Sequence, residues 1–225
     1  MKINILTIFP EMFDGWLNTG MIKIAQEKQM VEFKIIDIRN HTKNKHKKVD
    51  DYPYGGFEGM LMCVEPLDCA IIENNLEKTH KIFPSPRGKI LNQDGLKKLL
   101  EYDELTLIAG RYEGVDQRFI DMHVDEEISL GDYIITGGEL SIQVILDGVI
   151  RLIPDVLGNS LSYENESFSD NLLEQPQYTR PYEYKGLKVP DVLLCGDPKK
   201  INKWVYDEKY KITKERRPDL IKGDI

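Results

Sequence analysis

The chain alternates short apolar runs with amphipathic stretches, a pattern typical of a sheet covered by helices. Residues 3–8 and 31–38 are compact apolar runs of strand length. Between them, apolar residues recur at helical spacing: Phe13, Leu17, Met21, Ile24 and Ala25. Pro10 suits the first position of that helix, which we expect to run to about residue 28. The pattern predicts a βαβ unit and therefore a parallel α/β fold.

The later part of the chain gives further elements. We expect helices over 65–78, 96–102 and 139–152, and strands over 82–83, 105–109 and 134–135. The helix over 139–152 has the clearest apolar stripe: Leu140, Val144, Ile145, Val149 and Leu152. Pro154 ends it. The sequence leaves the order of the strands open.

The domain organisation follows from a change in composition after the last of these helices. We predict an α/β domain over 1–157, a polar linker over 158–171 and a small helical domain over 172–225. Asp197 and Pro198 provide an N-cap followed by proline at the first helical position, so a helix should begin there.

Glycines gather in one stretch. Five of the chain's 17 glycines lie between 110 and 138, directly after predicted strands. Such clustering indicates a close approach of the backbone to a ligand, although many glycine turns are only turns. The chain lacks the GxxxxGK[ST], GxGxxG, GxSxG and HExxH motifs. What remains is a site built from backbone groups, suited to a neutral nucleoside such as an adenosine moiety.

Charge and cysteine content narrow the choice of partner and compartment. The net charge of −8 disfavours nucleic acid, but 39–48 hold five basic residues and no acid, and 185–225 carry a local charge of +4. A solvated loop and a charged helix face would explain these patches equally well. Three cysteines without CxxC spacing favour buried thiols over disulfides or zinc. No apolar run reaches the length of a membrane span, so we expect a cytoplasmic protein.

Several motifs, in order along nearly the whole chain, then carry a resemblance. They are VDDYPYGGFEGM, SPRGKILNQ, GRYEGVDQR, SLGDYIITGGELS, DGVIRLIPDVLGN, ESFSDNLLEQPQYTRP and KVPDVLLCGDPKKINKW. Together they resemble the bacterial tRNA (guanine-37-N1)-methyltransferases of the SPOUT superfamily. The resemblance implies a parallel sheet with a C-terminal trefoil knot and a small helical C-terminal domain that binds tRNA. It also implies S-adenosyl-L-methionine as methyl donor, the anticodon stem-loop as substrate, and a homodimer with composite active sites.

The resemblance assigns residues to the cofactor site. By position these are Ser85, Pro86, Gly88, Gly110, Arg111, Tyr112, Gly114, Ser129, Leu130, Gly131, Tyr133, Ile135, Gly137 and Gly138. We expect alanine at the last two to abolish cofactor binding with little loss of fold, because a Cβ there would strike the ligand.

Three residues take catalytic positions by the same resemblance. Glu166 stands where the family usually has an aspartate that removes the N1 proton of guanine, and Glu164 and Asp170 are alternatives for that base. Arg151 would stabilise charge developing on the guanine oxygen, although a helix C-terminus alone would favour an arginine. Glu113 would contact the guanine or a magnesium ion, although an acid at the start of a helix is common.

Departures from the family pattern leave two other functions open. Gln177, Tyr52, Phe57, Glu58 and Arg87 replace the residues usual at their positions. The alternatives are a related enzyme acting on ribosomal RNA and a catalytically impaired protein that binds tRNA. In the family, the basic patches would contact tRNA phosphates, and Tyr178, Thr179 and Arg180 would help to place the tRNA.

Overall fold

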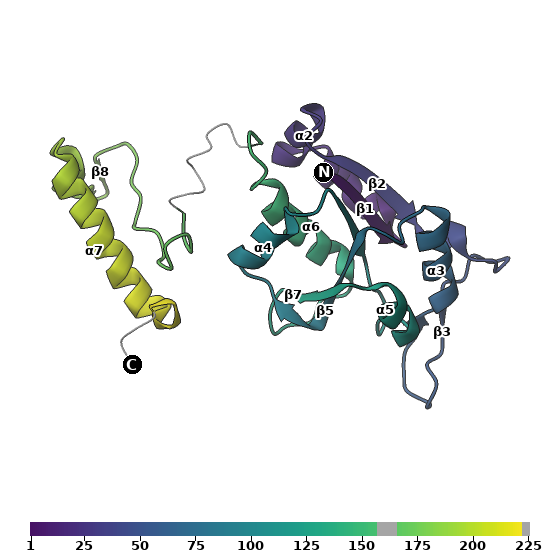
Figure 1. Cartoon of the computed structure of the whole chain (residues 1–225). Helices are drawn as coiled ribbons and strands as arrows, with labels where there is room; N and C mark the ends of the chain where they lie inside the picture. The colour runs from purple at the N-terminus through teal and green to yellow at the C-terminus, as the bar shows by residue number, and fades with distance from the viewer. Residues whose placement is uncertain (157–165, 222–225) are drawn as a thin grey trace. The chain divides into compact units, whose positions relative to one another are not determined.

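A computed structural model describes residues 1–156 and 166–221 (Figure 1). The chain divides near residue 158 into two compact units, which are described separately.

The first unit is built on a five-stranded parallel sheet with the order β2-β1-β6-β5-β7. The strands are β1 (Lys2–Thr7), β2 (Glu32–Asp37), β5 (His80–Ile90), β6 (Glu104–Ile108) and β7 (Glu126–Ser129). Four of the five residues of β6 are buried, as expected for a strand with helices on both faces. The predicted parallel α/β class is therefore confirmed.

Helices cover both faces of this sheet (Figure 1). One apolar cluster joins the sheet to α1 (Asp14–Leu17), α2 (Gly20–Glu27), α4 (Gln93–Leu99) and α6 (Gly138–Ile150). A second cluster joins the other face to α3 (Val64–Glu73) and α5 (Gln117–His123). Short elements complete the unit: the 3-10 helices η1 (Pro10–Phe13) and η2 (Ile38–His41), and the antiparallel pair β3 (Asp50–Asp51) and β4 (Leu61–Met62).

The prediction of one continuous helix over 10–28 is wrong, because this stretch divides into η1, α1 and α2. Side chains break it, because Asn18 donates to the Asp14 carbonyl and Thr19 donates to the Gly15 carbonyl. Gly20 then takes a φ of +57°, which a helix cannot continue through.

The predicted strand over 134–135 is also wrong. Ile134 is 80% exposed and lies in a loop. The strand that completes this side of the sheet is β7, and it follows α5.

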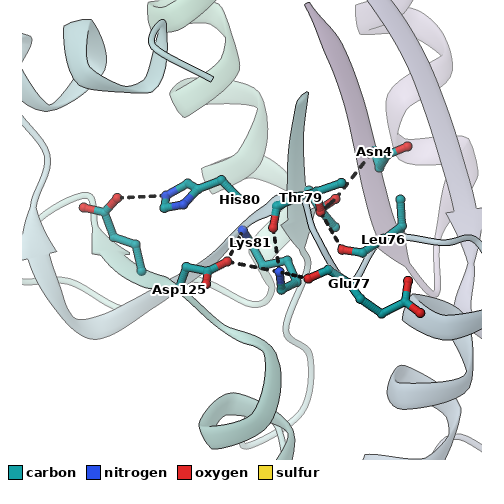
Figure 2. Close-up of polar contacts among 9 residues, drawn as sticks. Asn4, Leu76, Glu77, Thr79, His80, Lys81 and Asp125 are labelled. Carbon is teal, nitrogen blue, oxygen red and sulfur yellow. Dashed lines mark hydrogen bonds and ion pairs between the residues drawn. The ribbon is translucent and has the colours of Figure 1, made fainter. Parts of the chain in front are cut away.

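A polar network fills the amino-terminal half of the sheet (Figure 2). The buried Lys81 donates from Nζ to the Thr79 and Glu77 carbonyls at 2.5 and 3.1 Å and pairs with Asp125 at 3.1 Å. Thr79 bonds Thr106 of β6, which accepts from the Asn4 amide of β1. These bonds connect β1, β6 and β5 to the segment before β7, and they satisfy the buried side chains of Lys81, Thr79 and Thr106. The carboxyl ends of the strands carry the cavity described below.

The second unit consists of a β-hairpin and a long helix. Its elements are β8 (Glu183–Tyr184), β9 (Leu187–Lys188), η3 (Asp191–Leu194), α7 (Pro198–Arg216) and η4 (Pro218–Leu220). The predicted N-cap is confirmed, because Asp197 accepts from the Lys199 and Lys200 amides at 3.0 and 3.5 Å. Across 1–156 and 166–221, no helix combines the length and apolar character needed to cross a membrane.

Candidate active site

A cavity of about 660 Å³ opens at the carboxyl ends of the central strands of the first unit. Its volume lies in the range of small-molecule sites, and its position is the usual one for ligands of parallel α/β sheets. Thirteen of the fourteen residues assigned to the cofactor from the sequence line it: Ser85, Pro86, Gly110, Arg111, Tyr112, Gly114, Ser129, Leu130, Gly131, Tyr133, Ile135, Gly137 and Gly138. Segments far apart in the sequence therefore meet at one cavity.

Gly88, the fourteenth residue, is not part of the cavity lining. The register of β5 against β7 shifts between Pro84 and Lys89, and Gly88 lies within that shift. A Cβ at Gly88 would come within 2.4 Å of backbone atoms of Glu127 and Ile128. Glycine is needed there so that two chain segments can pack backbone to backbone.

The loop after β6 forms one wall of the cavity. Tyr112 has a φ of +59° and Gly114 a φ of +128°, so the chain turns sharply. Backbone hydrogen bonds hold this turn against residues 60–62. Glu113 N donates to Met60 O at 3.0 Å, and Met62 N donates to Gly114 O at 2.9 Å. Glu113 is exposed on this wall, four residues before α5 and outside the helix.

The loop over 130–138 forms the opposite wall and is tied to the first. Gly138 N donates to Gly110 O at 2.8 Å. A Cβ at Gly138 would lie 2.8 Å from Gly110 N and 2.9 Å from Ala109 Cα, and one at Gly137 would lie 2.3 Å from Arg111 Nε. The expectation that alanine would cost the fold little is wrong at Gly138, because the added carbon meets backbone atoms. At Gly137 the added carbon meets the Arg111 side chain, which would have to move.

A buried ion pair lies beneath this loop. Glu139 is fully buried, and its Oε2 lies 2.8 Å from Arg111 Nε, while Thr7 donates to its Oε1 at 2.8 Å. The Arg111 Nε–H is not directed at the oxygen, so the contact is an ion pair rather than a hydrogen bond. The guanidinium also lies 4.6 Å from the Phe9 ring centroid and bonds Thr136 O at 3.4 Å. Sequence reasoning missed Glu139, whose position in a helical stretch gave no signal of burial.

The three candidate catalytic residues are not brought together within one unit. Glu113 lines the cavity, and the half-buried Arg151 follows α6 as its C-cap, outside the cavity lining. Glu166 belongs to the second unit. Glu164, an alternative base, lies outside the described residues.

Within the second unit, the segment that carries Glu166 is packed on α7. Ser169 N donates to Glu166 O at 3.2 Å, and Leu173 N donates to Thr213 Oγ1 at 2.8 Å. The nearly buried Lys209 pairs with Asp170 at 2.5 Å. Asp170 is thus engaged as an anchor, which disfavours it as the alternative base. Lys209 and Thr213 are further residues that sequence reasoning missed, because a lysine and a threonine in a polar helix look solvated.

The remaining predictions about charge and metal have mixed outcomes. In the basic patch over 39–48, Glu65 lies 2.9 Å from Lys43 and raises the pKa of Lys43 by hydrogen bonding. Lys48 pairs with Asp51 at 3.2 Å. Among the described residues, no group of three His, Cys, Asp or Glu side chains is arranged to hold a metal ion. The cysteines are free. The prediction of buried thiols is wrong for Cys195, which is exposed, and holds only in part for Cys63 and Cys69, which are half-buried.

Parallel α/β domains with a small-molecule cavity beyond the strand ends commonly bind nucleotides or nucleosides there. Residues 1–223 match the family described as tRNA (Guanine-1)-methyltransferase TrmD, and the chain belongs to this family. It is similar to the tRNA (guanine-N(1)-)-methyltransferase of Fusobacterium nucleatum, with 52% identity over 99% of this chain and 92% of that protein. Proteins of the same name from Clostridioides difficile and Mycoplasmopsis synoviae are 47% and 49% identical, over 99% and 98% of this chain and 98% and 97% of their own lengths.

Proposed function

We propose that the protein transfers the methyl group of S-adenosyl-L-methionine to N1 of guanosine 37 in tRNA. The observation that carries the proposal is the cavity, where thirteen residues assigned by position in the sequence meet. Family membership and relatives named tRNA (guanine-N(1)-)-methyltransferase support the same reaction. The ribosomal RNA alternative has no comparable observation in its favour.

The cavity fits the proposed cofactor on physical grounds. Its volume of about 660 Å³ suits a ligand of this size, and glycines and small residues line much of it, so backbone groups can reach an adenosine moiety. Residues of the 110–114 and 129–138 loops would hold the nucleoside, and Ser85 and Pro86 would close the third side. When bound, the sulfonium supplies an electrophilic methyl group for in-line transfer.

Two side chains would serve the guanine. Glu166 would accept the N1 proton, a role that can contribute on the order of 10²- to 10⁴-fold to rate. Arg151, a permanently charged donor, would stabilise negative charge on the base oxygen. Glu113, at the cavity wall, would contact the guanine, and a magnesium ion beside it stays a prediction.

We further propose a knotted, homodimeric enzyme whose active site uses both subunits. Two close backbone contacts support the proposed knot, because a knot needs chain segments that pack tightly: Gly88 packs against β7, and Gly138 N donates to Gly110 O. Leu140 and Val144 on α6 are 50% and 54% exposed, one helical turn apart beside the cavity, and offer an apolar surface for a second copy. We retain 1–157 as the cofactor-binding domain and 172–225 as the tRNA-binding domain. Of the stretch 158–171, predicted as a linker, we propose that the part around Asp170 is held on α7 by the Asp170–Lys209 pair.

Labelled methyl transfer to tRNA tests the catalytic roles. Glu166→Gln should lower the single-turnover rate by at least 10²-fold, and Glu166→Asp should keep most of it. Arg151→Ala should lower the same rate while cofactor affinity, measured by calorimetry, stays unchanged. Full activity of Glu166→Gln would reject the base assignment, and binding of tRNA without any turnover by the natural protein would favour the impaired-enzyme alternative.

A further inference from the structure

The loop over 52–59 presents aromatic rings to solvent. Tyr52, Tyr54 and Phe57 are 78%, 95% and 74% exposed, although large aromatic side chains are ordinarily buried for most of their surface. Three such rings within six residues form a concentrated aromatic surface, which we call the aromatic loop.

Glycines give the aromatic loop a defined shape. Gly55, Gly56 and Gly59 have φ values of +93°, +74° and +85°, which side-chain-bearing residues rarely adopt. A Cβ at Gly55 would lie 2.8 Å from the Phe57 ring, so this ring folds back over the glycine. The loop therefore turns sharply, and the Phe57 ring packs against its own backbone.

The aromatic loop lies beside the wall of the cavity. A Cβ at Gly59 would meet the Glu113 side chain at 2.5 Å, so Glu113 lies across the end of the loop. The next residue, Met60, accepts from Glu113 N at 3.0 Å. A polymer whose reacting base enters the cavity past Glu113 would bring its neighbouring residues over the rings.

Positive charge adjoins the same loop. Residues 49–51 separate the aromatic loop from the basic patch over 39–48, and Lys48 pairs with Asp51, next to Tyr52. Arg118, whose side chain is 68% exposed, has a pKa raised by Asp116 and, to a smaller extent, by the nearby Tyr54. Exposed aromatic rings combined with cationic side chains are the usual surface for single-stranded nucleic acid, because bases stack on rings while phosphates meet cations.

We propose that the aromatic loop stacks against the unpaired nucleobases that flank the target guanosine. This inference rests on the proposed function. Stacking by Tyr52 or Phe57 would hold the neighbouring bases while the target base turns into the cavity, so the loop would select for unpaired, stackable neighbours.

The test combines protein variants with abasic RNA. The full-length protein, saturated with S-adenosylhomocysteine, is titrated with an anticodon stem-loop RNA, intact or with an abasic residue on either side of the target. Phe57→Leu keeps apolar bulk but removes the stacking face, and should weaken binding of the intact RNA on the order of tenfold. One of the two abasic RNAs should bind the natural protein more weakly than the intact RNA does, by a similar factor. Phe57→Leu should bind that abasic RNA as tightly as it binds the intact RNA, because the stacking contact is already lost. Phe57→Trp should restore binding.

Controls separate stacking from folding and from self-association. Tyr102→Leu removes a partly exposed ring that stacks on His80 at 3.9 Å, in the amino-terminal half of the sheet, and should leave RNA affinity unchanged. Cofactor affinity and the unfolding midpoint of Phe57→Leu should match those of the natural protein. The inference would be overturned if the losses caused by Phe57→Leu and by the abasic RNA added in full, or if Phe57→Leu left RNA affinity unchanged. It would also be overturned if the loss of affinity followed dissociation of a dimer, measured by light scattering. Methyl transfer by the natural protein tests the proposed function independently of these results.

Discussion

The buried pair of Arg111 and Glu139 supports the cavity wall, and removing one partner should destabilise the first unit. Arg111→Met keeps the length of the side chain and removes its charge. It leaves the Glu139 carboxyl fully buried, with the Thr7 hydroxyl as the remaining partner among those described above. Breaking a buried ion pair in this way costs about 3–5 kcal/mol in general. That cost arises because a charge buried away from water is left without its compensating partner.

Urea denaturation followed by circular dichroism at pH 7 measures the effect relative to the natural protein, away from the isoelectric point near 5.2. We expect Arg111→Met to lower the free energy of unfolding by about 3–5 kcal/mol. Glu139→Gln is the matched control, and its loss should be smaller because the partly exposed Arg111 can still reach water. A loss below about 1 kcal/mol for Arg111→Met would refute the reasoning.

Three further predictions concern other contacts. Gly138→Ala should lower the thermal midpoint by several degrees and weaken cofactor binding, because its Cβ would meet the Gly110 and Ala109 backbone; an unchanged midpoint would contradict this. Cys195 should react with a thiol reagent well before Cys63, since Cys195 is exposed and burial raises the pKa of Cys63; equal rates, followed spectrophotometrically, would contradict this. Lys209→Met should lower the single-turnover methylation rate at saturating tRNA, with cofactor affinity unchanged, by loosening the Asp170 anchor; Lys209→Arg should restore the rate if the anchor positions Glu166.

The sequence predicts well where a single physical requirement dominates a long stretch. The strands near residues 3–8 and 105–109 are buried between two helical layers, so their apolar runs are continuous. The predicted bounds of the helix α6 differ from Gly138–Ile150 by two residues at most. The predicted stripe is wrong at Leu140 and Val144, which are 50% and 54% exposed, whereas Ile145 and Val149 are buried. Asp197 and Pro198 likewise fix one end of α7 through local chemistry alone.

Prediction fails where tertiary contacts decide a short segment. The helix α5 spans less than two full turns, and the strand β7 has four residues. Both are too short for the spacing of apolar residues to show a helical or strand pattern. Ile134 and Ile135 have the composition of a strand, but their loop is tied down at Gly138 and forms the wall of the cavity. Gly20 stops a helix whose apolar spacing is otherwise regular.

Tertiary contacts that the sequence does not reveal also decide how the candidate site is built. Clustered glycines correctly mark the cavity, yet the reason for glycine at 88, 137 and 138 is contact with the protein's own atoms, which no sequence pattern reveals. Glu166 stands in a polar stretch that reads as linker, and the contacts that order its neighbours come from Lys209 and Thr213, about forty residues later on α7. A carboxylate can act as a positioned base only if the segment that carries it is held in place. The Asp170–Lys209 pair supplies such a hold within the second unit, so the acid proposed as base belongs by its contacts to that unit rather than to a tether.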